Sequence, residues 1–261
     1  MYHKQRQIKK LTTYIPAAET FRALASEQDC VFLDSSLVND LGRFSIIGAC
    51  PYLKLVKDGE KFFINEKEET GITFEDYLRN YLRDHVDQNE SELPLVSGAV
   101  GYFSYDYGRK LQGVPSGEKA LVKIPDAVLT FYDVYLIEDC HQKETYLVAN
   151  GITADASEKI QEMEQKIRQR TERKEEQKVP HNIIVTPNFE KEEYKKAVDD
   201  MIHYIIEGDI YITNMTQQLT IESDKAPLDV FYDLRKNNPS PFGGDMAISR
   251  SSVLLRNVSS R

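Results

Sequence analysis

The residue types that most often do chemistry are present in this 261-residue chain, but they do not form a recognisable catalytic set. The five histidines are scattered and lack the spacing of metal ligands: His3, His85, His141, His181 and His203. Adjacent carboxylates occur at 192–193 and 199–200 on a predicted helix, where a solvated face is the simpler interpretation. The sequence also lacks a phosphate-binding glycine loop with a lysine and a nucleophile elbow. We therefore predict no catalytic residue and no metal ligand within this chain.

Composition indicates a globular protein of the reducing cytosol. Hydrophobic residues make up 41% of the chain and charged residues 29%, and no apolar run approaches the roughly 20 residues that span a bilayer. A formal net charge of −9 disfavours nucleic acid and anionic membranes, which attract basic surfaces. The three cysteines lack metal-ligand spacing. We expect a cytoplasmic protein with free thiols and with neither a nucleic-acid nor a membrane partner.

The amino-terminal part of the chain predicts a short helix followed by β structure. Residues 17–25 have a helical pattern, and strand patterns follow at 30–35, 43–48, 52–56 and 61–64. The Asp58-Gly59 pair predicts a tight hairpin between the last two strands, because glycine tolerates the positive φ of such turns. A second hairpin is predicted from residues 129–137 and 145–149. Residues 73–86 predict a helix with Thr73 as its N-cap, and we interpret its aromatic stripe as core packing.

A highly charged stretch divides the chain. Residues 155–178 carry charges of both signs beside one thin apolar stripe, which is typical of a solvated helix that leads into a linker. An amphipathic helix then ends at Gly208, and a strand over 210–221 and a helix over 228–236 follow. We therefore predict an amino-terminal domain (1–154), a charged helix and linker (155–182), and the start of a second domain (183–244). Long strands with inserted helices indicate an α+β fold of two packed, largely antiparallel sheets with helices outside.

Four segments carry a family resemblance. Residues 32–35 and 43–45 read FLDS and RFS, residues 97–106 read SGAVGYFSYD, residues 208–218 read GDIYITNMTQQ, and residues 238–242 read NPSPF. In that order they resemble the LLES…RYS, GGAVGYFSYD, GDIYQVNLTQR and NPSPY/F motifs of the anthranilate synthase component I and aminodeoxychorismate synthase component I family. The resemblance spans most of residues 32–244. It implies the α+β fold of anthranilate synthase component I, present here incompletely.

The resemblance also implies a tryptophan-type pocket between two sheets. Its positions are Ser35, Arg43, Phe44, Pro241, Phe242 and Gly243. An indole needs an aromatic or proline wall, and its ammonium and carboxylate groups need a few polar partners. Asp34 stands where the family usually has glutamate or histidine. The alternative interpretation, that these residues only bridge the two sheets, stays open at this point.

The implied activity belongs to the large subunit of aminodeoxychorismate (p-aminobenzoate) synthase. In the family, this subunit makes 4-amino-4-deoxychorismate for folate synthesis from chorismate, with ammonia from a glutamine amidotransferase subunit. Phe242-Gly243, in place of a tyrosine-methionine pair, and the run Asn214-Met215-Thr216-Gln217 favour this assignment. The alternatives are anthranilate synthase component I of tryptophan biosynthesis and, in another class, a non-catalytic module that binds tryptophan or the amidotransferase.

The same resemblance places the chemistry outside this chain. In the family, chorismate and Mg²⁺ are held by residues of the carboxy-terminal half, where Mg²⁺ offsets carboxylate charge and helps the hydroxyl leave. The catalytic residues and the Mg²⁺ ligands are therefore expected beyond residue 261.

The residues after Gly244 do not resemble the family. When they are back-translated with permitted synonymous codons and read two bases later, they give YGDFAILSSSPERFLQ, the motif expected next in the family. So long a match in one phase has little chance of arising at random. We therefore expect residues 245–261 to be an out-of-frame tail and the chain to be a truncated, inactive part of a larger enzyme.

Overall fold

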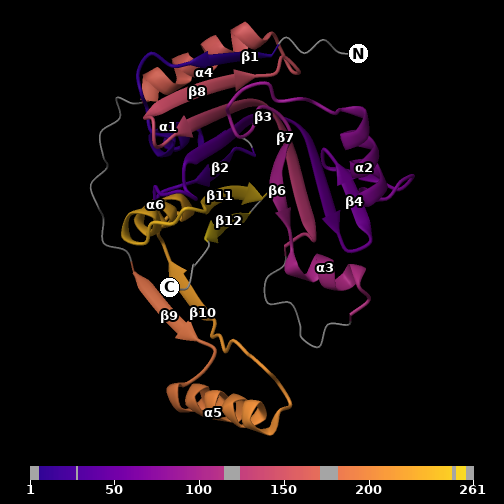
Figure 1. Cartoon of the computed structure of the whole chain (residues 1–261), viewed down its shortest axis with the longest axis vertical. Helices are drawn as coiled ribbons and strands as arrows, with labels where there is room; N and C mark the ends of the chain where they lie inside the picture. Colours follow the sequence, from indigo (N-terminus) through magenta and orange to yellow (C-terminus); the bar gives the residue numbers. More distant parts are fainter. Residues whose placement is uncertain (1–5, 28, 115–123, 171–181, 249–250, 257–261) are drawn as a thin grey trace. The chain divides into compact units, whose positions relative to one another are not determined.

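The computed structural model describes residues 6–27, 29–114, 124–170, 182–248 and 251–256, and Figure 1 shows their order along the chain. The chain divides into two compact units. Unit 1 consists of Met1–Lys174 and Val230–Arg261, and unit 2 consists of Glu175–Asp229. The domain limits expected from the sequence (154, 182 and 244) stay a prediction. Residues 171–181 of the expected linker, His181 within them, and His3 lie outside the described residues.

Unit 1 is built on one ten-stranded sheet whose described pairs are all antiparallel. Its main path runs through β1 (Gln7–Lys10), β8 (Glu144–Ala149), β7 (Ala127–Asp139), β3 (Phe44–Asp58), β2 (Val31–Asp34), β11 (Gly243–Ile248) and β12 (Ser251–Arg256). Three strands lie off this path: β4 (Lys61–Ile64) pairs with β3, β5 (Lys67–Glu69) with β4, and β6 (Ala99–Phe103) with β7.

The central pair of this sheet is β3 with β7. Every residue of β7 is buried, so the side chains on both faces of this strand are covered. The two strands predicted at 43–48 and 52–56 form a single strand, β3. Cys50 has a positive φ of 54°, and the register with β7 shifts between Pro51 and Leu53. This β-bulge places one extra residue in β3 while the strand continues in the sheet. A local sequence pattern does not show that the two predicted strands are continuous.

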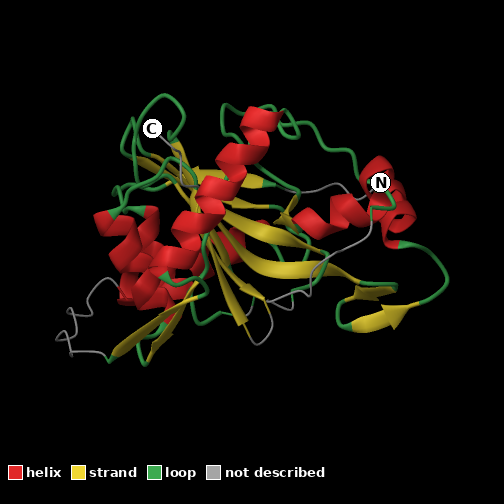
Figure 2. Cartoon of the chain, turned by 90° about the horizontal axis from the view of Figure 1, so that it is seen from below, coloured by secondary structure: helices red, strands yellow, loops and turns green. Residues whose placement is uncertain are grey.

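Helices cover the sheet of unit 1 (Figure 2). Helix α1 (Ala17–Leu24) contacts β2, β3 and β7, and it also contacts α4 (Ala156–Arg170). The apolar stripe of α4 is fully buried, because α4 lies against β8 and β1: Ile160, Met163 and Ile167 are each 3% exposed. The prediction of a solvated helix was therefore wrong for this face of α4, and the hydrophobic effect explains the difference.

The remaining helices of unit 1 match the predictions with one addition. Helix α2 (Phe74–Asp84) begins as expected, since the Thr73 side chain accepts a hydrogen bond from the Asp76 amide at 3.1 Å. Phe74 is buried with Phe62 and Tyr107, and Tyr77, Leu78 and Tyr81 pack against the same cluster, which confirms core packing for these positions of the stripe. Leu82, the last position of the stripe, is 50% exposed. Helix α3 (Tyr105–Leu111) was not predicted; Ser104 caps it. Helix α6 (Pro227–Asn237) confirms the last predicted helix, and its residues from Val230 onward belong to unit 1.

Unit 2 contains β9 (Ile183–Pro187), α5 (Lys191–Glu207) and β10 (Leu219–Ser223), with β9 and β10 paired antiparallel. A capping box formed by Glu190 and Glu193 begins α5, and Gly208 ends it in the left-handed conformation at φ 83°, as predicted. The strand predicted over 210–221 begins only at Leu219, because β10 pairs with β9 and the preceding residues face no strand in the described part of the chain. The α+β class with antiparallel sheets is confirmed.

Gly101 has a role that follows from its surroundings in β6. A Cβ atom at this position would overlap the carbonyl oxygen of Val128 on β7. We expect Gly101→Ala to lower the free energy of unfolding by about 2 kcal/mol, the usual cost of overpacking a close backbone approach. Gly108→Ala in α3 is the matched control, because a Cβ there meets no atom within 4 Å and alanine favours helix. Urea denaturation followed by circular dichroism measures both, and an unchanged midpoint for Gly101→Ala would contradict this account.

Candidate functional site

The pairing of β11 with β2 creates the candidate site in unit 1. Gly243 lies opposite Asp34 and Gly244 opposite Leu33, so the segment before β11 meets the segment after β2. A side chain at Gly243 would stand 3.4 Å from the Asp34 carbonyl oxygen. Residues more than 200 positions apart in the sequence therefore share one end of the sheet.

Ser35 connects several segments at this end of the sheet through hydrogen bonds. Its hydroxyl lies 2.7 Å from the carbonyl oxygen of Phe44 and 3.0 Å from that of Pro241, and can donate to either. Its amide donates to the Ser45 hydroxyl at 3.0 Å. Ser35 therefore contacts two other predicted pocket positions, Phe44 and Pro241, through their backbone carbonyl oxygens.

A second group of contacts, which the sequence did not predict, closes the loop after β2 against the loop before β11. The Ser36 hydroxyl accepts from the Ser240 amide at 2.9 Å, and the Leu37 amide donates to the Ser240 carbonyl oxygen at 3.0 Å. Gly42 is buried here, and a Cβ on it would overlap the Leu37 carbonyl oxygen and stand 3.1 Å from Pro241. The close approach of these two loops therefore requires glycine at position 42.

Asp34 is the most unusual polar residue at the site. It is 3% exposed, and its Oδ2 accepts a hydrogen bond from Arg235 Nε of α6 at 3.0 Å. Its Oδ1 is buried and has no hydrogen-bond partner in the described structure. Burial raises the pKa of this carboxyl, and the Arg235 ion pair opposes the shift only in part. An acceptor in this state leaves part of its hydrogen-bonding capacity unused inside the protein. Nothing in the sequence indicated that Arg235 would be the partner of Asp34.

Arg43 and Phe44 form a stacked pair beside this group. The guanidinium carbon of Arg43 lies 4.6 Å from the centroid of the Phe44 ring, and Nε and Nη2 donate to Asp139 Oδ2 at 3.0 and 2.6 Å. Burial alone would raise the pKa of Asp139, but hydrogen bonds from Arg43 and from the His141 and Gln142 amides hold it below its ordinary value. Arg43 therefore keeps its position through Asp139 while part of the guanidinium remains accessible, since its side chain is 42% exposed.

The structure thus brings the predicted positions to one end of the sheet, but they differ in their surroundings. Ser35 is buried, Phe44 and Pro241 are half-buried, and Phe242 is 52% exposed. The Phe242 side chain therefore borders the site on its solvent-exposed side and does not close it. Whether the site holds tryptophan stays a prediction.

The described residues do not provide a magnesium site. They contain no group of three or more histidine, cysteine, aspartate or glutamate side chains that could hold a metal ion. His85 is the C-cap residue of α2, and its ring stacks on that of Tyr81 with the centroids 4.1 Å apart, whereas His203 lies on α5 beside Glu207. Mg²⁺ prefers several oxygen ligands in a near-octahedral arrangement. The described residues do not offer such a group of ligands, so no chemical step is assigned to Mg²⁺ in this part of the chain.

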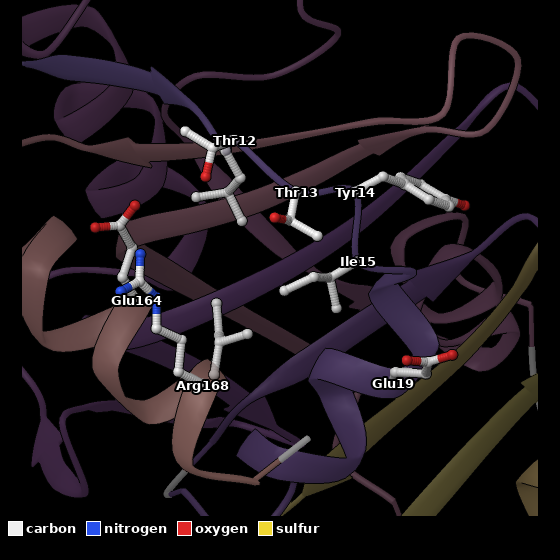
Figure 3. Close-up of a pocket in the computed structure, with 9 residues that line it drawn as sticks. Thr12, Thr13, Tyr14, Ile15, Glu19, Glu164 and Arg168 are labelled. Carbon is white, nitrogen blue, oxygen red and sulfur yellow. The ribbon is translucent and has the colours of Figure 1, made fainter. Parts of the chain in front are cut away.

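A separate cavity of about 340 Å³ lies between the segment before α1 and helix α4 (Figure 3). Its floor is apolar, and Thr12, Thr13, Glu19, Glu164 and Arg168 supply polar atoms around it. Glu164 is paired with Lys9 at 2.8 Å. None of the six predicted pocket positions lines this cavity.

Comparison with known proteins identifies relatives over most of the chain. A family model described as "chorismate binding enzyme" matches residues 35–254. Anthranilate synthase component 1 of Acetivibrio thermocellus is 26% identical in an alignment 259 residues long that covers 89% of this chain and 52% of that protein. Aminodeoxychorismate synthase component 1 of Escherichia coli (strain K12) is 26% identical in an alignment 221 residues long that covers 81% of this chain and 46% of that protein. This chain therefore spans about half the length of these relatives.

A solved structure shows the same fold. Anthranilate synthase component I from Streptococcus pneumoniae TIGR4 superposes with a TM-score of 0.62 at 20% identity, over 78% of this chain and 47% of that one. In the described part of the present chain, no helix is long and apolar enough to cross a membrane.

The buried Asp34 predicts a specific pH dependence of stability. Since burial raises its pKa, the folded chain holds this proton more tightly than the unfolded chain. The stabilisation is fully present below about pH 4, the ordinary pKa, and is lost as pH rises through the raised pKa. We expect Asp34→Asn to become more stable relative to the unsubstituted chain as pH rises above about 4, the ordinary pKa of the carboxyl.

Urea denaturation at unit steps of pH measures this difference. Asp40→Asn, at an exposed position, controls for the removal of a carboxylate. A difference that moves the other way, in favour of the aspartate as pH rises, would show that the Arg235 ion pair outweighs burial.

Proposed function

We infer the function of this chain from its family, because the chain belongs to the chorismate-binding enzymes. We propose that it represents the amino-terminal part of the large subunit of an aminodeoxychorismate synthase. The complete enzyme would convert chorismate and ammonia to 4-amino-4-deoxychorismate, with ammonia delivered by a glutamine amidotransferase subunit. The match over residues 35–254, which includes all six positions of the candidate pocket, is the observation that carries the proposal.

The choice of product rests on single residues, because the relatives divide between two activities. An anthranilate synthase and an aminodeoxychorismate synthase are each 26% identical to the chain. Phe242-Gly243, in place of a tyrosine-methionine pair, and the run Asn214-Met215-Thr216-Gln217 favour aminodeoxychorismate synthase. Anthranilate synthase component I is the alternative.

In this proposal the described residues supply a scaffold to the enzyme, and the reacting groups come from elsewhere. The groups that hold chorismate and Mg²⁺ are proposed to belong to the half of the relatives that this chain does not span. Mg²⁺ would there neutralise carboxylate charge and assist departure of the hydroxyl.

An activity assay tests this division. Removal of one electrostatic stabiliser costs about 10²–10³ in rate, so the 261-residue chain should show no turnover of chorismate with ammonium, Mg²⁺ and an amidotransferase subunit. A version whose reading frame is shifted after Gly244 and continues into the downstream gene should form 4-amino-4-deoxychorismate, detected as p-aminobenzoate after a coupled lyase step. Anthranilate as the main product would move the assignment to anthranilate synthase. Turnover by the 261-residue chain would contradict the proposal.

A second candidate function, binding of tryptophan, is favoured by the unpartnered atom of Asp34. The ammonium group of an amino acid would satisfy Asp34 Oδ1, which lacks a hydrogen-bond partner in the described structure. The accessible part of the Arg43 guanidinium has further N–H groups for a carboxylate. Pro241, Phe242 and Phe44 provide apolar surface for an indole. The site would act as a binding module even where no reaction takes place.

Titration calorimetry with tryptophan tests this second function on the purified chain. We expect measurable binding that weakens about tenfold or more in Phe242→Ala, because an aromatic contact surface is lost. Phe242 is 52% exposed, so the substitution should leave the fold intact. Tyr105→Ala removes an aromatic ring that is 92% exposed elsewhere in unit 1 and should leave the affinity unchanged. The absence of heat with the unsubstituted chain would exclude the tryptophan site.

A further inference from the structure

The cavity between the segment before α1 and helix α4 lies apart from the candidate site. It is named here the α4 cavity, and it is lined by residues 11–15, Glu19, Glu164, Ile167 and Arg168. All of these residues belong to unit 1, so the cavity is formed within one compact unit. Its volume of about 340 Å³ is near the lower end of the roughly 300–1,000 Å³ of small-molecule pockets. The α4 cavity therefore suits a small ligand.

Contacts with the sheet hold the walls of the α4 cavity in place. The segment before α1 is tied to β8 at both ends, because the Leu11 amide donates to the Thr145 carbonyl oxygen and the Thr145 hydroxyl donates to the Ile15 carbonyl oxygen, each at 2.8 Å. At the start of α1, the Ala17 amide donates to Glu138 Oε2 at 2.8 Å. Helix α4 is fixed by its buried apolar stripe. A ligand therefore meets walls that are already ordered, which lowers the cost of binding.

Two opposite charges at the α4 cavity have no partner among the described residues. The Glu19 carboxylate and the Arg168 guanidinium both line the cavity, and neither forms an ion pair or a side-chain hydrogen bond in the described part of the chain. Glu164 differs, because its carboxylate is paired with Lys9 at 2.8 Å. Figure 3 shows Arg168 on one side of the cavity and Glu19 on the other. A ligand with both an ammonium and a carboxylate group would pair with both charges at once.

The groups between these two charges define the rest of the ligand. Thr12 and Thr13 lie between them in Figure 3, and their hydroxyls can donate to a carboxylate. The hydroxyl of Tyr14 is already occupied, since it donates to Glu138. Three aliphatic side chains form the apolar part of the lining: Leu11, Ile15 and Ile167. This surface favours a ligand with an aliphatic side chain.

We propose that the α4 cavity binds a zwitterionic α-amino acid with an aliphatic side chain. The carboxylate of the ligand accepts hydrogen bonds from Arg168 and the threonine hydroxyls, and its ammonium group donates to Glu19. Its side chain packs on the aliphatic lining. This site is separate from the six positions beside Asp34, and it does not depend on the reaction proposed for the complete enzyme.

Titration calorimetry with L-leucine tests the proposal on the full 261-residue chain. We expect saturable binding with a Kd of about 1 mM or lower. Two analogues each lack one charge of leucine: 4-methylpentanoate lacks the ammonium group, and 3-methylbutylamine lacks the carboxylate. Each should bind about tenfold more weakly or worse, because one charge of the cavity is left without its partner.

Substitutions at the two charges locate the site. Arg168→Gln and Glu19→Gln should each weaken leucine binding about tenfold or more, for the same reason. Both positions are exposed, so neither substitution should unfold the chain. Glu158→Gln is the matched control, because Glu158 is exposed on α4 and lies outside the lining, and it should leave the affinity unchanged.

Three outcomes would overturn the proposal. The chain could give no saturable heat with leucine. Either analogue could bind as tightly as leucine, or either substitution could leave the affinity for leucine unchanged, which would show that the two charges do not hold the ligand. Finally, Phe242→Ala could abolish leucine binding, which would place the ligand at the candidate site beside Asp34.

Discussion

The antiparallel pairing of β3 with β7 is the constraint on which unit 1 depends. β7 is buried over its whole length, so its backbone N–H and C=O groups have to be satisfied within the sheet. β3 supplies the partner along nearly its full length, and β8 and β6 complete the other side of β7. β2 is attached to the far edge of β3, and only through β2 does β11 join the sheet. The position of the candidate site is therefore a consequence of this central pair.

The site shows how a sheet edge can assemble polar chemistry from distant sequence. Asp34 ends β2 and Ser35 follows it, whereas Arg235 and Pro241 come from the helix and loop that precede β11. The Asp34–Arg235 ion pair occupies one carboxylate oxygen and leaves the other buried without a partner in the described structure. Such an arrangement costs folding free energy, and a site that receives a ligand recovers part of it.

Local signals in the sequence were sufficient for the elements whose ends are fixed by their own residues. Thr73, the Asp58-Gly59 pair and Gly208 each act within a few residues, and the structure places each as predicted. The strand expected at 210–221 was mostly wrong, because a strand exists only with a partner and periodicity does not say where that partner lies. The burial of α4 was missed for the same reason, since its neighbours β1 and β8 are distant in sequence.

The residues of the candidate site were also predicted only in part. The family resemblance named Ser35 and Pro241, and the structure joins them. It did not indicate Arg235, Ser240 or the need for glycine at 42, because these depend on how two loops approach each other.

The separation of 206 residues between Ser35 and Pro241 also has a consequence in time. At the usual rates of bacterial and eukaryotic synthesis, roughly 10 to 40 s pass between translation of the first residue and translation of the second. By then β3, β7, β8 and helix α4 have all left the ribosome, whereas one edge of β2 still lacks its partner β11. Ser35 and the carboxylate of Asp34 therefore remain open to solvent until almost the whole chain has been made. A nascent chain halted within α6 would contain the strands from β1 to β8 and would lack β11 and the loop residue that Ser35 contacts.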